Sequence, residues 1–244
     1  IKELPTVDYI LVPVGGGGLC TGVSTLAKLL NPKIKVIAVE PAGAACLKAS
    51  LEAGEVTTVS KINTIADGTA VQTPGDKLFP YLQANVDHVI TVDDSELTLS
   101  FLDMAENHKM IVENSGLLTV AALRHLDVKN KKIVSILSGG NMDVLTMATV
   151  VQNGLMQRDR IFTVSVMLPD KPGQLAAVSS LIAKEQGNVI KLEHNVFANV
   201  NRTAGVELTI TLESFGTEHK DQIIKALEAA GYCPVITKTN GIYM

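Results

Sequence analysis

The sequence has few of the features that mark nucleic-acid or membrane partners. Its 244 residues include no tryptophan, five phenylalanines and four tyrosines, and its formal net charge is −4. Nucleic-acid binding relies on basic surfaces and on aromatic rings that stack with bases, so this composition argues against such a partner. No apolar run approaches the roughly 20 residues of a membrane-spanning helix, and residues 1–10 lack a signal-peptide pattern. We therefore expect a cytoplasmic protein without a membrane partner.

Cysteines and histidines are too scattered to form the common metal or hydrolase sites. Cys20, Cys46 and Cys233 lie far apart without a CxxC motif, so we expect neither a disulfide framework nor a zinc site. The histidines form no HExxH motif, and no GxSxG motif marks a serine hydrolase. The chemistry has to come from other residues.

The most informative feature is a run of four glycines after an apolar segment. Residues 9–14 read YILVPV and predict a buried strand, which the glycines follow directly. Consecutive residues without Cβ expose several backbone N–H groups to a phosphate. Apolar residues at helical spacing predict a helix over 19–30, whose N-terminus strengthens the anion site. This pattern predicts a phosphate site at Gly15, Gly16, Gly17, Gly18 and Leu19.

The common nucleotide motifs do not fit this loop. The final glycine of a dinucleotide fingerprint is replaced by Cys20 or Thr21, depending on the register, and Val23 stands where a P-loop needs lysine. Glu40 follows the next predicted strand, about 20 residues beyond the loop, where dinucleotide enzymes keep the acid that binds ribose. A nucleotide-dependent oxidoreductase therefore stays open as an alternative.

A second glycine loop points to the same ligand. Residues 132–137 read KIVSIL and predict another buried strand, and Ser138 and Gly139 follow it. In an open parallel sheet, ligands gather at the carboxyl ends of the strands. We therefore expect the two loops to frame one site, in which the Ser138 hydroxyl meets a heteroatom of a small phosphorylated molecule.

Five motifs in this order give the chain a family resemblance. They are VPVGGGGL at 12–19, VEP at 39–41, TIADG at 64–68, ENSG at 113–116 and LSGGN at 137–141. Over residues 1 to about 155 the chain resembles the fold-type II pyridoxal phosphate enzymes, and within them the threonine dehydratases, with serine racemases and serine dehydratases as near relatives. The resemblance implies part of an open, mainly parallel α/β sheet domain. It also implies pyridoxal 5′-phosphate, bound by the loops at 15–19 and 138–139 and lined by Gly68 and Glu113.

The resemblance also shows what this sequence lacks. The family's Schiff-base lysine lies in a Ser-x-Lys segment well before the glycine loop, and Lys2 is the only lysine before Gly15. We therefore expect no catalytic residue in this chain, which would be the C-terminal part of a longer enzyme and inactive alone. The alternative is a non-catalytic, amino-acid-binding regulatory protein.

A cation site is a further implication of the resemblance. In the racemases and some dehydratases, a divalent ion is bound by the glutamate of a Glu-Pro pair, a carbonyl four residues on and an acid six residues on. The matching residues here are Glu40, Ala44 and Cys46. A thiol in place of a hard oxygen ligand weakens the expectation of Mg²⁺ or Ca²⁺, and a monovalent cation held mainly by carbonyls stays open. The alternative is an ordinary carboxylate at a strand end.

Charge and pattern change near residue 156, where a second domain is expected. We place the first domain at 1–155, a linker at 156–160 and a regulatory domain at 161–244. The second segment predicts a ferredoxin-like β-α-β-β-α-β order, with its second strand over 188–197. The motif LPDKPGQL at 168–175 resembles the signature of ACT domains, which pair through their sheets and bind amino acids between subunits. That likeness implies an effector site at Pro172, Gly173, Gln174, Leu175, Asn188, Val189 and Ile190.

Together these resemblances predict a regulated lyase. The complete enzyme would deaminate L-threonine, or also L-serine, and threonine would give 2-oxobutanoate and ammonia. A branched-chain amino acid would be the effector, because the product leads to isoleucine and the residues beside Gly173 and Asn188 are apolar. We expect a homodimer or homotetramer.

Overall fold

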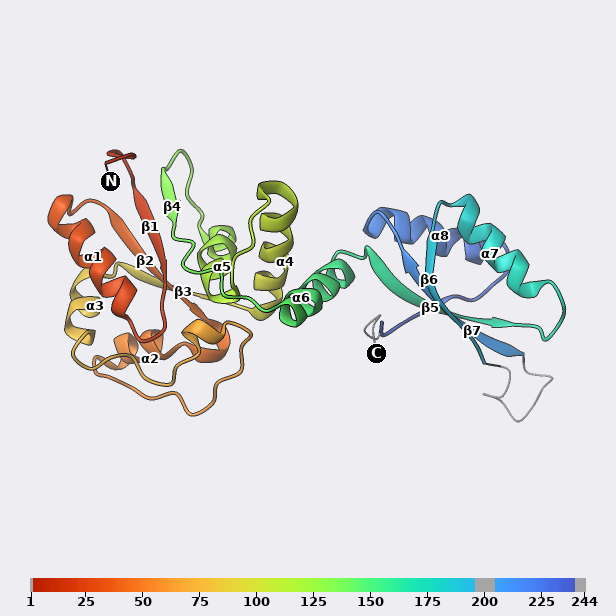
Figure 1. Cartoon of the computed structure of the whole chain (residues 1–244), viewed down its shortest axis with the longest axis horizontal. Coiled ribbons are helices and arrows are strands. Elements are labelled where there is room, and N and C mark those ends of the chain that lie inside the picture. The colour runs from red at the N-terminus through yellow and green to blue at the C-terminus, as the bar shows by residue number, and fades with distance from the viewer. Residues whose placement is uncertain (1, 196–204, 240–244) are drawn as a thin grey trace. The chain divides into compact units, whose positions relative to one another are not determined.

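The computed structural model of the chain describes residues 2–195 and 205–239 (Figure 1). Contacts divide the chain into two compact units, residues 1–147 and 148–244. The division falls inside helix α6, Val144–Gln157, whereas the sequence places a linker at 156–160. Residues 156 and 157 close that helix and 158–160 form a turn and bend. The domain limits given above therefore stay predictions.

The first unit contains a parallel four-stranded sheet. Its strands are β1 (Tyr9–Pro13), β2 (Lys35–Pro41), β3 (His88–Val92) and β4 (Ile133–Ser135), in the order β3-β2-β1-β4. Tyr9 pairs with Lys35 on one side and with Ile133 on the other. Residues 36–39 of β2 read VIAV and are all buried, as expected of a central parallel strand that is covered on both faces.

Helices connect these strands in α/β fashion. They are α1 (Gly18–Leu30), α2 (Cys46–Ala53), α3 (Phe79–Asn85), α4 (Asp94–Asp103) and α5 (Asn114–Ala121). A short 3₁₀ turn, Asp67–Thr69, interrupts the long loop before α3. Helix α4 begins where it does because Asp93 and Glu96 form a capping box.

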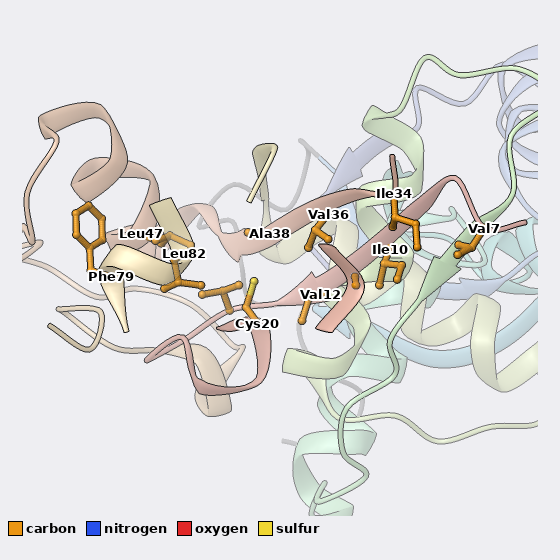
Figure 2. Close-up of a cluster of buried hydrophobic side chains, with 12 residues drawn as sticks. Val7, Ile10, Val12, Cys20, Ile34, Val36, Ala38, Leu47, Phe79 and Leu82 are labelled. Atoms are coloured by element: carbon orange, nitrogen blue, oxygen red, sulfur yellow. The ribbon is translucent and has the colours of Figure 1, made fainter. Parts of the chain in front are cut away.

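Apolar side chains from β1 and β2 pack with side chains of α1, α2 and α3 in the core of this unit. Figure 2 shows the cluster running from Val7 and Ile34 at one end to Leu82 and Phe79 at the other. Cys20 belongs to it and is fully buried. Burial, with a smaller effect of the Glu40 charge, raises the pKa of the Cys20 thiol to about 12. Cys20 therefore acts as a packing residue.

The second unit has the predicted ferredoxin-like order. Its elements are β5 (Ile161–Leu168), α7 (Gln174–Lys184), β6 (Asn188–Asn195), β7 (Val206–Glu213), α8 (Thr217–Ala229) and β8 (Val235–Thr237). The sheet order is β6-β7-β5-β8 with antiparallel pairs. Alternate β5 residues, from Phe162 to Leu168, pack in one core with residues of α7 and α8. The last two residues of the predicted strand at 188–197 lie outside the described residues.

Among the residues that the structure describes, no helix combines the length and the apolar character needed to cross a bilayer.

Candidate active site

The two glycine loops lie where the order of the strands reverses, so that the chain adds strands on one side of β1 and then on the other. From β1 the chain passes through α1 to β2 on one side, while β4 lies on the other side of β1. The loop at 15–18 follows β1, and Ser138 comes shortly after β4. The carboxyl ends of these adjacent parallel strands form the crevice in which open α/β sheets bind ligands.

The first loop can accept an anion on its open side. Gly17 has a φ of 95° and forms the N-cap of α1, and an added Cβ would come within 2.7 Å of the Leu82 side chain. The first bond of the helix runs from the Thr21 N–H to the Gly17 carbonyl at 2.8 Å. The N–H groups just before Thr21 therefore have no acceptor inside the helix. A Cβ added to Gly16 or Gly18 would meet nothing within 4 Å.

A cavity of about 200 Å³ opens above this loop. It brings together most of the residues that the sequence predicted for one site. Its lining contains Pro13, Gly15, Gly16, Gly17, Gly18, Leu19, Gly68, Thr69, Glu113, Ser115 and Ser138. Gly139 is absent from this lining, but its Cα lies against the carboxylate of Glu113. The roles of these residues toward a cofactor stay predictions.

Glu113 and the second glycine loop form a closely fitted pair. Gly139 has a φ of 108°, and a Cβ placed there would come within 2.3 Å of the Glu113 Oε1. The Glu113 N–H donates to the Gly139 carbonyl, and the Asn141 N–H donates to Glu113 Oε2, both at 3.3 Å. Glycine at 139 is therefore what lets the Glu113 carboxylate lie against the loop.

A larger cavity of about 460 Å³ shares three lining residues with the first. The shared residues are Gly68, Glu113 and Ser115. Apart from Ile65 and Met142, its other lining residues are polar. They are Asp67, Asn114, Asn141, Asp143 and Thr146. Its walls come from the motifs at 64–68 and 113–116 and from residues at the end of the motif at 137–141 and just after it. The motifs alone do not show that these three segments meet.

The geometry of Glu40 does not favour the predicted cation site. Its side chain is fully buried, and its two oxygens accept the N–H groups of Leu47 and Lys48 at 2.7 and 2.8 Å. Burial raises the pKa of Glu40, and these two N–H donors oppose the rise. Burial, followed by the nearby Glu40 charge, raises the pKa of the Cys46 thiol to about 12. Glu40 thus caps the N-terminus of α2, much like a capping acid.

The described ranges, 2–195 and 205–239, contain no group of three or more His, Cys, Asp or Glu residues that could hold a metal ion. The cation predicted at Glu40, Ala44 and Cys46 would be bound partly by a backbone carbonyl, so this finding does not test it and it stays a prediction.

The predicted effector residues lie around the start of α7 and the start of β6. Gly173 is the N-cap of α7 with a φ of 90°, and a Cβ there would meet nothing within 4 Å. Leu175, Val189 and Ile190 expose 37%, 38% and 36% of their surface. The Asn188 amide donates to Glu213 Oε2 at 3.1 Å. Within one chain, Gly173 and Asn188 lie toward opposite ends of the sheet. Gly173 follows the end of β5 at Leu168, whereas Asn188 pairs with Glu213, the partner of Ile161 at the start of β5. A single effector site would need residues of two subunits, and it stays a prediction.

Comparison with known families decides the classification. Residues 1–139 match the model of the family described as pyridoxal-phosphate dependent enzyme, and residues 162–231 match the ACT domain. The chain belongs to the pyridoxal-phosphate dependent enzymes. This confirms the predicted family, its cofactor pyridoxal phosphate and the predicted combination of a fold-type II domain with a ferredoxin-like ACT domain.

Two curated relatives match nearly the whole chain. The L-threonine ammonia-lyase of Geobacter sulfurreducens is 37% identical over 240 residues, which covers 98% of this chain and 60% of that protein. The L-threonine ammonia-lyase of Thermotoga maritima is 35% identical over 233 residues, covering 95% and 58%. The chain therefore spans about three fifths of the length of these two relatives.

A solved structure supports the same assignment. The processed form of threonine deaminase isoform 2 from Solanum lycopersicum aligns with a TM-score of 0.59 and 34% identity, covering 62% of this chain and 46% of that one.

Proposed function

We propose that this chain supplies the cofactor-binding part and the regulatory domain of an enzyme that deaminates L-threonine to 2-oxobutanoate and ammonia. The observation that carries this proposal is the pair of glycine loops at the carboxyl ends of β1 and β4, which line one cavity with Gly68 and Glu113. The substrate is inferred from the names of the curated relatives, both L-threonine ammonia-lyases. L-serine is proposed as a second substrate.

The residues around the smaller cavity suit pyridoxal phosphate. The backbone N–H groups of Gly15 to Leu19 would hold its phosphate, because they begin a 13-residue helix and face open space at Gly16 and Gly18. Ser138 would face the ring nitrogen, and Gly68 and Glu113 would line the ring. When bound, the cofactor supplies an electron sink for the amino acid's α-carbon. A neutral Ser138 hydroxyl does not hold the ring nitrogen protonated, which suits β-elimination.

The alternatives gain no support from the geometry. An oxidoreductase would need Glu40 to bind a ribose, but both of its oxygens accept backbone N–H groups and its side chain is fully buried. A non-catalytic regulatory protein keeps the same cofactor cavity and differs only in activity. Activity is therefore the property to measure.

The test of the proposed function uses the complete gene product that contains this chain. With pyridoxal phosphate it should convert L-threonine to 2-oxobutanoate, detected by mass spectrometry, and any L-serine turnover should appear as pyruvate. The same protein without added amino acid is the control. Cofactor binding without either product would support the regulatory alternative and contradict a lyase.

Regulation is proposed to act through the ACT domain. A branched-chain amino acid would bind between paired ACT domains of a homodimer or homotetramer, with Gly173 contributed by one subunit and Asn188 by its neighbour. An effector bound there can influence a distant active site only if it prefers one arrangement of the subunits.

Calorimetry on this chain should therefore detect isoleucine or valine at millimolar concentration, and Gly173→Leu should abolish the heat by filling the approach to the α7 N-terminus. Threonine and serine serve as comparison ligands. Unaltered heat in Gly173→Leu would place the effector elsewhere. Absence of heat with every amino acid would leave the ACT domain a pairing element.

A further inference from the structure

The position of Gly68 depends on a loop that is held mainly by side chains. Gly68 lines both cavities and lies in the short 3₁₀ turn Asp67–Thr69, which directly follows the loop 64–66. Both backbone polar groups of Ile65 are bound by side chains from other elements. The loop is therefore positioned by those side chains more than by a regular ladder of backbone bonds.

Asp94 holds the first half of this loop. It is the first residue of α4, just after the carboxyl end of β3. Its Oδ1 accepts the Thr64 hydroxyl at 2.6 Å, and its Oδ2 accepts the Ile65 N–H at 3.1 Å. A carboxylate that accepts two donors from adjacent residues fixes both the position and the direction of the chain.

Asn114 holds the second half. Its Nδ2 donates to the Ile65 carbonyl at 2.9 Å across 49 positions of sequence. Since a carbonyl oxygen only accepts, the amide nitrogen has to face it. The Oδ1 of the same amide is buried and has no hydrogen-bond partner within the part of the chain that the structure describes.

An unpartnered buried acceptor costs folding free energy, so each such group needs an explanation. An apolar side chain at 114 would avoid the cost, since the residue is only 6% exposed. What it would lose is the donor to Ile65. Asn114 also follows Glu113 directly and begins α5, so it ties the loop bearing Gly68 to the segment bearing Glu113.

We propose that Asn114 is a positioning residue for the cofactor cavity. By holding the Ile65 carbonyl, it fixes the position of Gly68 relative to Glu113 in the cavity wall. This inference rests on the proposed function. Asn114 belongs to the segment ENSG at 113–116, for which the resemblance implied a role of Glu113 only. Asn114 acts through Ile65 and Gly68. Its unpartnered Oδ1 lowers stability, and its Nδ2 holds the loop in place.

The test compares Asn114→Ala and Asn114→Leu with Asn85→Ala in the full chain. Asn85 is a matched control because its amide also makes a single side-chain bond, to Thr25 at 3.3 Å, and lines neither cavity. The probe is pyridoxine 5′-phosphate, which has the ring and phosphate of the cofactor but no aldehyde to react with surface lysines. Its binding is followed by its own fluorescence, and loop mobility by hydrogen exchange of the Ile65 and Ala66 amides.

Both Asn114 variants should weaken probe binding about 3- to 12-fold, the equivalent of one lost hydrogen bond. Exchange at Ile65 and Ala66 should speed up by a similar factor. The unfolding temperature should change little in either variant, because removal of the unpartnered Asn114 Oδ1 offsets the loss of the donor to the Ile65 carbonyl. Asn85→Ala should change neither binding nor exchange at the loop.

Two results would overturn the proposal, and they differ from failure of the function itself. Wild-type binding and exchange in both variants would show that Asn114 positions nothing. Losses of binding in strict proportion to a fall in unfolding temperature would show a merely structural role. If the unmodified chain does not bind the probe, the proposed cofactor cavity fails and the positioning role fails with it.

Discussion

Replacing Gly139 by alanine is expected to lower the free energy of unfolding by about 1–3 kcal/mol, the cost of forcing a side chain into a disfavoured backbone region. The φ at this position is 108°, and the new Cβ would come within 2.3 Å of Oε1 and 2.5 Å of Cδ of Glu113. Glu113 would have to move away from the loop, and the wall of the cofactor cavity would move with it. Urea unfolding and probe binding measure the two effects.

Gly140 provides the matched control for this substitution. It is the next residue, its φ lies outside the left-handed region, and the nearest atom to an added Cβ is the Ile111 carbonyl oxygen at 3.8 Å. Gly140→Ala should therefore change stability by no more than about 0.5 kcal/mol. Equal effects of the two substitutions would contradict the close fit of Gly139 and Glu113.

A second large effect is expected at Gly16. An alanine there meets no atom of the protein within 4 Å, so the fold should tolerate it. The added methyl group would instead occupy the space proposed for the phosphate. Overpacking of this kind should weaken binding of pyridoxine 5′-phosphate by about 5- to 150-fold.

Gly22, inside the helix α1 that follows this loop, offers a matched control for the same substitution. An added Cβ at Gly22 also meets nothing within 4 Å, but the residue lies outside the lining of the cavity. Gly22→Ala should leave probe binding unchanged and raise stability by about 0.5–1 kcal/mol, because alanine favours a helix interior. Probe affinity that is equal in Gly16→Ala and Gly22→Ala would exclude the glycine loop as the phosphate site.

The parts of the site predicted from sequence are those in which backbone chemistry dictates residue type. Gly17 and Gly139 have positive φ values, and no other residue type adopts them as easily. Strands that end in such loops place them at one edge of a parallel sheet, so their proximity follows from topology. The ferredoxin-like unit was predictable for a similar reason, since alternate residues of β5 from Phe162 to Leu168 face one core.

The parts that were not predicted depend on contacts between distant segments. Asp94 and Asn114 meet Ile65 across 29 and 49 positions of sequence, and neither residue type is unusual at a helix start. Glu40 shows the opposite difficulty. Its motif implied a cation ligand, but the beginning of α2 lies so close to the end of β2 that two backbone N–H groups take both carboxylate oxygens.

The most direct test of the central claim is an amide NMR titration of this chain with pyridoxine 5′-phosphate. We expect the largest shifts on Gly15 to Leu19, with smaller ones at Gly68 and Ser138, and we expect Gly16→Ala to remove them. Shifts confined to other residues, or a spectrum unchanged at millimolar probe, would contradict a phosphate site at the carboxyl ends of β1 and β4.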